Sequence, residues 1–181
     1  MKTLRPVLLA LLLAGCAAPH GYEADAVPLI AANYHASDAL VAIAKAHLDP
    51  DKPIIVATVV DIDDLERSST LGRFISESVS ARFTQSRYRM VEMKFQNAVY
   101  MKKGEGELML TRQIRDIAAA HQAQAVIVGT YSRAASAVFV NLKVVLPESN
   151  VVIAATDYPL RMNRDVCMMI TRDPRACSEK W

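Results

Sequence analysis

The feature that most constrains the fold is an apolar run of almost exclusively β-branched residues at positions 54–60. A strand of this composition has no face suited to water, and it is typical of a sheet that is covered on both sides. Parallel strands buried in this way belong to α/β folds. We therefore expect an α/β domain with this segment in the middle of the sheet.

Helices are predicted before and after this run in the chain. Asn33 is expected to cap the first helix, whose apolar residues recur at three- and four-residue steps until Pro50 stops it. The side-chain oxygens of residues 68–70 can cap a second helix that ends near Ser86. Thr111 can cap a third. The segment between residues 61 and 67 is expected to be a turn.

Further strands are predicted after the second helix, three of them in quick succession. In residues 137–146, apolar side chains alternate with Asn141 and Lys143, which is typical of an antiparallel strand with one wet face. The fold predicted is a mixed sheet of about five strands with helices packed on it, in the order β-α-β-α followed by an antiparallel three-stranded meander. The additional strands are placed at 88–93, 125–133, 137–146 and 151–161.

The N-terminus has the features of a lipoprotein export signal. Lys2 and Arg5 precede an apolar run that ends in Leu13, Ala14, Gly15 and Cys16, the order of a lipobox. The run is shorter than the roughly 20 apolar residues that a transmembrane helix needs. We expect residues 1–15 to be removed and lipid to be attached to Cys16. The alternative is an ordinary secretory leader with a cysteine near its cleavage point.

The remaining chain divides into three parts. Residues 16–32 contain prolines and little periodicity and are expected to be a flexible tether, residues 33–162 a single α/β domain, and residues 163–181 a polar extension. Cys167 and Cys177 form an even pair in an exported chain, which favours a disulfide between them. Two reduced thiols, or bonds to other thiols, are the alternatives.

The charge of the chain argues against a nucleic-acid partner. The net charge of +2 comes from Lys2 and Arg5, so the part after the leader has 19 basic and 19 acidic side chains. Nucleic-acid binding depends on clustered positive charge that displaces counterions, and no basic stripe with interleaved aromatic residues is present. We expect protein or membrane partners instead.

The sequence contains no recognisable catalytic, metal or cofactor motif. The acidic residues between positions 61 and 66 lack the glycine and terminal glutamate of a calcium loop, and they suit a solvated helix start. The histidines have no zinc spacing. A Gly-x-Ser-x-Gly nucleophile motif is absent, and the pair Gly104 and Gly106 lacks the third glycine of a dinucleotide site. We therefore expect a protein that is not an enzyme, with no catalytic residue, metal or cofactor.

Several sequence blocks nevertheless stand out: residues 68–74, 104–112 and 128–131, with the strand residues 138–142. In order and spacing these blocks resemble the FlgO family of flagellum-associated outer-membrane proteins, over about residues 40–160. The family has serine at the position of Thr111, a change that should keep the cap. The resemblance implies a non-catalytic protein at the Gram-negative outer membrane that is needed for motility and supports the flagellum.

The partners expected are the outer membrane, through the lipid anchor, envelope or flagellar proteins, and a further copy of the chain in a homo-oligomer. Ala17 directly after the lipidated cysteine fits sorting to the outer membrane. A strand edge at 151–161 could accept a partner strand. The alternative function is a periplasmic domain that holds a cell-wall fragment or a cation in a cleft beside 61–67. The second candidate partner surface is the helix start formed by Ser69, Thr70, Leu71, Gly72 and Arg73.

Overall fold

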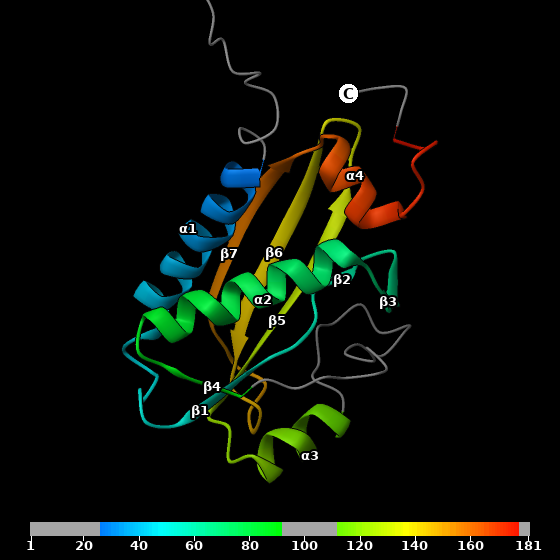
Figure 1. Cartoon of the computed structure of the whole chain (residues 1–181). Helices are drawn as coiled ribbons and strands as arrows, with labels where there is room; N and C mark the ends of the chain where they lie inside the picture. Colours follow the sequence, from blue (N-terminus) through cyan, green and yellow to red (C-terminus); the bar gives the residue numbers. More distant parts are fainter. Residues whose placement is uncertain (1–25, 92–111, 178–181) are drawn as a thin grey trace, which may run out of the picture.

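A seven-stranded mixed sheet organises the chain (Figure 1). The computed structural model describes residues 26–91 and 112–177, so the lipobox, the turn at Gly104 and Gly106 and the cap at Thr111 lie outside the described residues. The elements are α1 (Ala26–Ala44), β1 (Pro53–Val56), β2 (Val60–Asp61), β3 (Asp64–Ser68), α2 (Thr70–Gln85), β4 (Arg89–Val91), α3 (Arg112–Ala120), β5 (Ala125–Arg133), β6 (Ala137–Val145), β7 (Val152–Arg161) and α4 (Arg164–Thr171).

β5 is the centre of the sheet. Along one edge it pairs in parallel first with β1 and then with β2, and along the other edge it pairs antiparallel with β6. β4 flanks β1 in parallel, β3 flanks β2 in a hairpin, and β7 pairs with β6. The predicted α/β class and the antiparallel meander are therefore confirmed. The segment 54–60, predicted in the middle of the sheet, is parallel and interior but lies beside the central β5, with β1 between β5 and β4. The predicted turn at 61–67 is wrong, because most of it forms the β2–β3 hairpin.

The expected continuous strand at 54–60 is interrupted at residues 57–59. From Val56 to Val60 the chain advances by four residues, whereas β5 advances by three from Ile127 to Thr130. One residue is thus extra, as in a β-bulge, and the pairing with β5 is broken locally. This break and the hairpin strand β3 raise the number of strands from five to seven.

A serine of α2 takes over the hydrogen bonds that the interrupted strand loses. Ser76 Oγ accepts from the Val59 N–H (2.9 Å) and donates toward the Ala57 carbonyl oxygen (3.0 Å). A buried backbone group without a partner is costly, so this side chain stabilises the break. The hydroxyl also lies 3.0 Å from the Gly72 carbonyl oxygen. The break is therefore fixed to α2 by a side chain that the apolar pattern of the helix does not identify.

α2 approaches this break closely because it has a glycine there. A Cβ at Gly72 would overlap the carbonyl oxygen of Val59. Only glycine permits such an approach of two backbones. Ser69 caps the helix at the same place, since its Oγ accepts from the Gly72 N–H at 3.0 Å. The predicted capping of this helix by a serine of residues 68–70 is confirmed.

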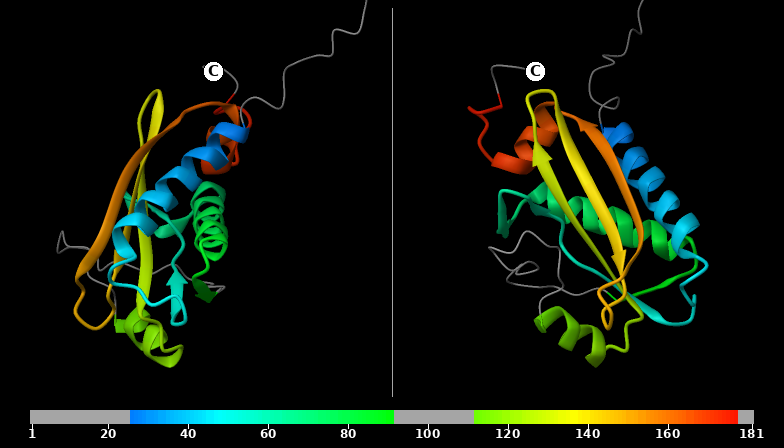
Figure 2. Two further views of the ribbon diagram at one scale, coloured as in Figure 1. Left: turned by 90° about the vertical axis from the view of Figure 1, so that its left-hand side faces the viewer. Right: turned by 180° about the vertical axis from the view of Figure 1, so that it is seen from behind.

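Three helices cover one face of the sheet, and the fourth packs at one end of the sheet (Figure 2). α1, α2 and α4 lie on one face, where their apolar side chains form the main core with β5, β6 and β7. α3 lies on the other face and packs its Ile114 and Ala118 against the start of β5. In β1, Ile54 belongs to the first core and Ile55 to the second, and both are buried. The strand is covered on both faces, as its composition predicts.

α1 differs from the predicted first helix. It begins at Ala26, so the last part of the expected tether, residues 26–32, is helical. Pro28 is tolerated because the first N–H groups of a helix have no partner within it. Asn33 is not a cap but lies buried inside the helix, and Ile43, expected on the apolar face, is 50% exposed. The predicted start at Asn33 is therefore wrong, because the prediction relied on the apolar periodicity that begins after this residue.

Asn33 links α1 to the last strand of the sheet. Its Oδ1 accepts a hydrogen bond from the Tyr158 hydroxyl (2.8 Å), and its backbone carbonyl accepts from Ser37 (2.7 Å). Burial raises the pKa of Tyr158 well above its ordinary value, because the phenolate would lose its solvation. A buried polar pair thus fixes α1 to β7.

The C-terminal extension is more ordered than its polar composition suggests. It contains α4, which Asn163 caps by accepting from the Val166 N–H at 2.9 Å. Val166 and Ile170 join the main core. A disulfide joins Cys167 and Cys177, whose Cα atoms lie 5.8 Å apart. The segment 163–177 is therefore part of the folded domain.

Replacing Gly72 with alanine should destabilise the protein by about 2–3 kcal/mol, because the added methyl group displaces the Val59 carbonyl or α2 itself. Chemical denaturation measures the loss. Glu77→Ala, at an exposed position of the same helix, is the matched control and should change stability by less than about 0.5 kcal/mol. Equal stability of the two variants would contradict the close approach.

Tyr158 should make the protein less stable in alkali. The pKa of Tyr158 in the folded protein lies above its value of about 10 in the unfolded chain. The neutral phenol therefore contributes its full share to the free energy of unfolding below about pH 10. That share is lost as the pH rises further, by up to about 1.4 kcal/mol per pH unit. Denaturation series from neutral to alkaline pH should show a steeper decline for the wild type than for Tyr158→Phe. Tyr34→Phe should keep the wild-type decline, and parallel profiles for all three would refute the role of Tyr158.

Candidate partner-binding surfaces

The start of α2 offers less surface to a partner than its sequence suggests. Ser69 and Leu71 are buried, and Gly72 lies against the backbone of Val59. Only Thr70 and Arg73 of the five predicted residues have side chains at the surface. The first, third and fourth positions of the motif at 69–73 therefore serve the packing of α2 on the sheet.

Two arginines meet at Thr70. Arg73 Nη2 donates to Thr70 Oγ1 (3.3 Å), and Arg172 Nε donates to the same oxygen (3.4 Å). The ion pairs found between described side chains are Arg82 with Asp38 and Arg133 with Asp61, so neither arginine at Thr70 belongs to them. Arg172 comes from the loop after α4, 102 residues further along the chain. Sequence spacing alone could not place it here.

Asp61, the first residue of the acidic segment that follows residues 54–60, has a structural role. Asp61 is only 6% exposed, and its carboxylate accepts from the Asp63 N–H (3.1 Å) and lies 3.5 Å from Arg133 Nε. It closes the β2–β3 hairpin and links it to the end of β5. In the two described stretches, no three acidic, histidine or cysteine side chains are grouped as a metal site would require.

β7 is an edge strand, as expected for residues 151–161. In the part of the sheet that the structure describes, β7 pairs with β6 alone. Such an edge presents unpaired N–H and carbonyl groups to which another strand can add. Pro159 lies within this strand. Proline has no N–H to donate, so it is tolerated on an edge strand, where no neighbouring strand needs that donor. Figure 2 shows α1 running alongside this strand on the helix-covered face.

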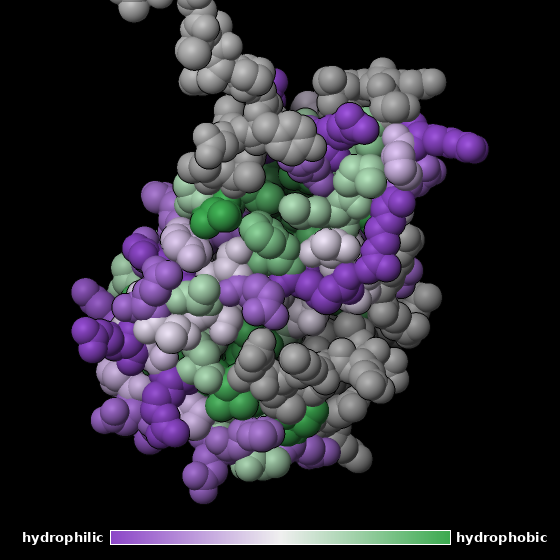
Figure 3. Space-filling view, viewed as in Figure 1, coloured by the Kyte–Doolittle hydropathy of each residue, from purple (hydrophilic) through white to green (hydrophobic). Residues whose placement is uncertain are grey.

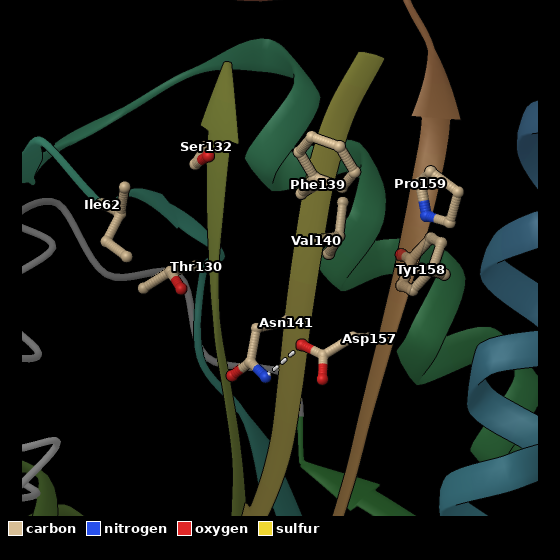
Figure 4. Close-up of a pocket in the computed structure, with 9 residues that line it drawn as sticks. All are labelled: Ile62, Thr130, Ser132, Phe139, Val140, Asn141, Asp157, Tyr158 and Pro159. Carbon is tan, nitrogen blue, oxygen red and sulfur yellow. Dashed lines mark hydrogen bonds between the residues drawn. The ribbon is translucent and has the colours of Figure 1, made fainter. Parts of the chain in front are cut away.

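A shallow hollow of about 290 Å³ lies on the other face of β5, β6 and β7 (Figure 4). Its floor is formed by two neighbouring rows of residues, and each row runs across the three strands. The polar row is Thr130, Asn141 and Asp157, and the second row is Ser132, Phe139 and Pro159. Ile62, from the β2–β3 hairpin, forms the side wall, and Val140 and Tyr158 complete the lining.

The hollow is apolar on one side and acidic on the other. Phe139 and Ile62 are 54% and 53% exposed, which is unusual for side chains of their size. Asn141 Nδ2 donates to Asp157 Oδ1 at 2.6 Å and holds that carboxylate in place, as Figure 4 shows. The alternation in 137–146 identifies Asn141 as a residue of the wet face. Phe139 lies two residues before Asn141 and therefore on the same face of β6.

The histidines of the described residues are not grouped with other metal-ligating side chains. His35, His47 and His121 are exposed and lie on different elements or loops, with no cluster around any of them. Within residues 26–91 and 112–177, no helix has the length and apolar content needed to cross a bilayer.

Comparison with known proteins identifies the fold and the family. The LpoB C-terminal domain from Salmonella enterica superposes with a TM-score of 0.52 at 12% identity, covering 74% of this chain and 98% of that one. The LpoB C-terminal domain from Escherichia coli gives 0.50 at 12% identity, with the same coverage. At this identity the likeness concerns the fold alone. A search of curated proteins returned no match.

A model of the FlgO protein family matches residues 34–165. This stretch includes most of α1, all seven strands and the start of α4. It also contains the three blocks that resemble the family in sequence. The chain therefore belongs to the FlgO family.

Proposed function

We propose that this protein is a lipid-anchored, non-catalytic assembly protein of the Gram-negative outer membrane, and that it supports the flagellum where the filament's base crosses the envelope. The observation that carries the proposal is the FlgO family match over residues 34–165. The lipobox that ends at Cys16 supplies the anchor. The flagellar role follows from what the family resemblance implies.

The anchor determines how weak contacts become effective. Each buried methylene of an acyl chain contributes about 0.8 kcal/mol, and several chains on one cysteine hold a domain at the membrane durably. Envelope partners then meet the domain at high effective concentration. The hollow beside Phe139 and the open edge of β7 are the surfaces we assign to such partners.

Deleting the gene should reduce swimming in soft agar in the organism of origin, and the wild-type gene should restore it. Cys16→Ser should fail to restore swimming, because the protein loses its anchor and appears in the soluble fraction. Ala18→Ser, which leaves the lipobox intact, is the matched control and should restore both membrane fractionation and swimming. Normal swimming of the deletion strain would overturn the flagellar role.

A second function has one observation in its favour. The alternative of a ligand-binding domain placed a cleft beside residues 61–67, and Ile62 of that segment does form a wall of the hollow. The carboxylate available there is Asp157 rather than the buried Asp61. An amine-bearing cell-wall fragment would suit an apolar hollow with one acidic side.

Thermal melting separates the two functions. A ligand at a hundred times its dissociation constant stabilises the folded protein by about 2.7 kcal/mol. Under the assembly function, muropeptides and divalent cations should leave the melting temperature unchanged. A rise that is absent in Asp157→Asn but present in Asp165→Asn, an exposed aspartate outside the hollow, would instead establish ligand binding.

A further inference from the structure

The folded domain has a defined end where the chain enters it from the N-terminus. α1 starts at Ala26, at the same end of the domain as α4 and the turn between β5 and β6, as Figures 1 and 2 both show. Residues 17–25 separate this point from Cys16. A chain of that length spans at most about 35 Å, roughly the length of a ten-residue strand such as β7. We call this the anchor end, since it is the end nearest to the attached lipid.

Arginine is the only basic residue type that the described segment 161–177 contains. Figure 3 shows strongly hydrophilic side chains projecting beyond α4 at this end. Arg73 adjoins the segment through the Thr70 hydroxyl that it shares with Arg172. The segment has four exposed arginines and two exposed aspartates, Asp165 and Asp173, an excess of two positive charges to which Arg73 of α2 lies adjacent. We define the arginine surface as Arg73, Arg161, Arg164, Arg172 and Arg175.

The opposite end of the domain is close to neutral. It comprises the loops after α1 and α2, the exposed side of α3 and the turn after β6. Its described basic and acidic side chains number five and four. They are Lys45, Lys52, Arg87, Arg89 and Arg115, with Asp49, Asp51, Asp116 and Glu148. The excess of positive charge is therefore concentrated at the anchor end.

The arginines at Thr70 are arranged to share an anion. Two guanidinium groups that donate to one hydroxyl repel each other, and none of the ion pairs between described side chains offsets that repulsion. A phosphate group has several oxygens and can accept from both groups at once. Arginine suits phosphate better than lysine does, because its planar donors match the phosphate oxygens in pairs.

We propose that the arginine surface lies on the phosphate groups of the membrane that holds Cys16, so that the anchor end faces the bilayer and the opposite end faces away. This inference rests on the proposed lipid attachment. Basic side chains near an anionic membrane surface each strengthen binding by about fivefold. The anchor keeps the surface close to its ligand, so modest affinity is sufficient to orient the domain.

The contact with phosphate can be measured without the anchor. The chain from residue 16 onward, with Cys16→Ser, should cosediment at low ionic strength with vesicles that contain phosphatidylglycerol, and less with phosphatidylcholine vesicles. The double variant Arg161→Gln/Arg172→Gln should bind about 30-fold more weakly. The matched control Lys45→Gln/Arg87→Gln removes the same charge from the opposite end and should bind like the parent chain. Added salt should abolish binding, since the interaction is screened.

Two results would overturn the inference: no cosedimentation of the parent chain, or equal weakening by both double variants. Circular dichroism melts of all chains establish that the variants fold, and α2 and α4 do not depend on either arginine for core packing. Detection of lipid on Cys16 is an independent measurement. Lipid on Cys16 without vesicle binding would refute the orientation and leave the proposed function standing, whereas vesicle binding without lipid would refute the anchor, and the orientation with it, and leave only the contact with phosphate.

Discussion

The fold depends on the packing of Val59 between two glycines. On one side a Cβ at Gly72 of α2 would overlap the Val59 carbonyl, and on the other a Cβ at Gly129 of β5 would lie 3.1 Å from Val59 Cγ2. Ser76 then satisfies the backbone of the interrupted strand. Helix, central strand and strand break thus meet at one point, and α1 and α4 pack around the helix placed there. Both glycines lie in blocks that resemble the FlgO family.

Segments in which the pattern of side chains favours a single secondary structure could be predicted from sequence. The alternation around Asn141 and Lys143 identifies an antiparallel strand, and the strands at 125–133 and 137–145 follow almost residue for residue. The break at 57–59 could not be predicted, because it depends on a serine and a glycine from α2. The early start of α1 was missed for a similar reason, since Asn33 is polar in sequence but paired with Tyr158 in the fold.

Surfaces were harder to predict than elements. The start of α2 is a conspicuous motif, yet Leu71 and Gly72 are buried and their role is packing. Phe139 has the opposite character, because it is an aromatic residue on the wet face of its strand and lies half exposed in the same hollow as Asp157. Which face of a sheet remains open depends on where distant helices pack. The alternation within one strand shows that one of its faces is wet, but not which residues of other strands and hairpins meet on that face.

We propose a small α/β domain that acts at a membrane, with an anchor at one end and open sheet surfaces along its side. The central claim of this proposal is the lipid on Cys16. Intact mass spectrometry of the protein purified from membranes tests it most directly. The account predicts a chain that begins at residue 16 and carries the added mass of a diacylglyceryl thioether and an acylated amine. An intact Met1, or an unmodified Cys16 in protein recovered from the soluble fraction, would contradict it.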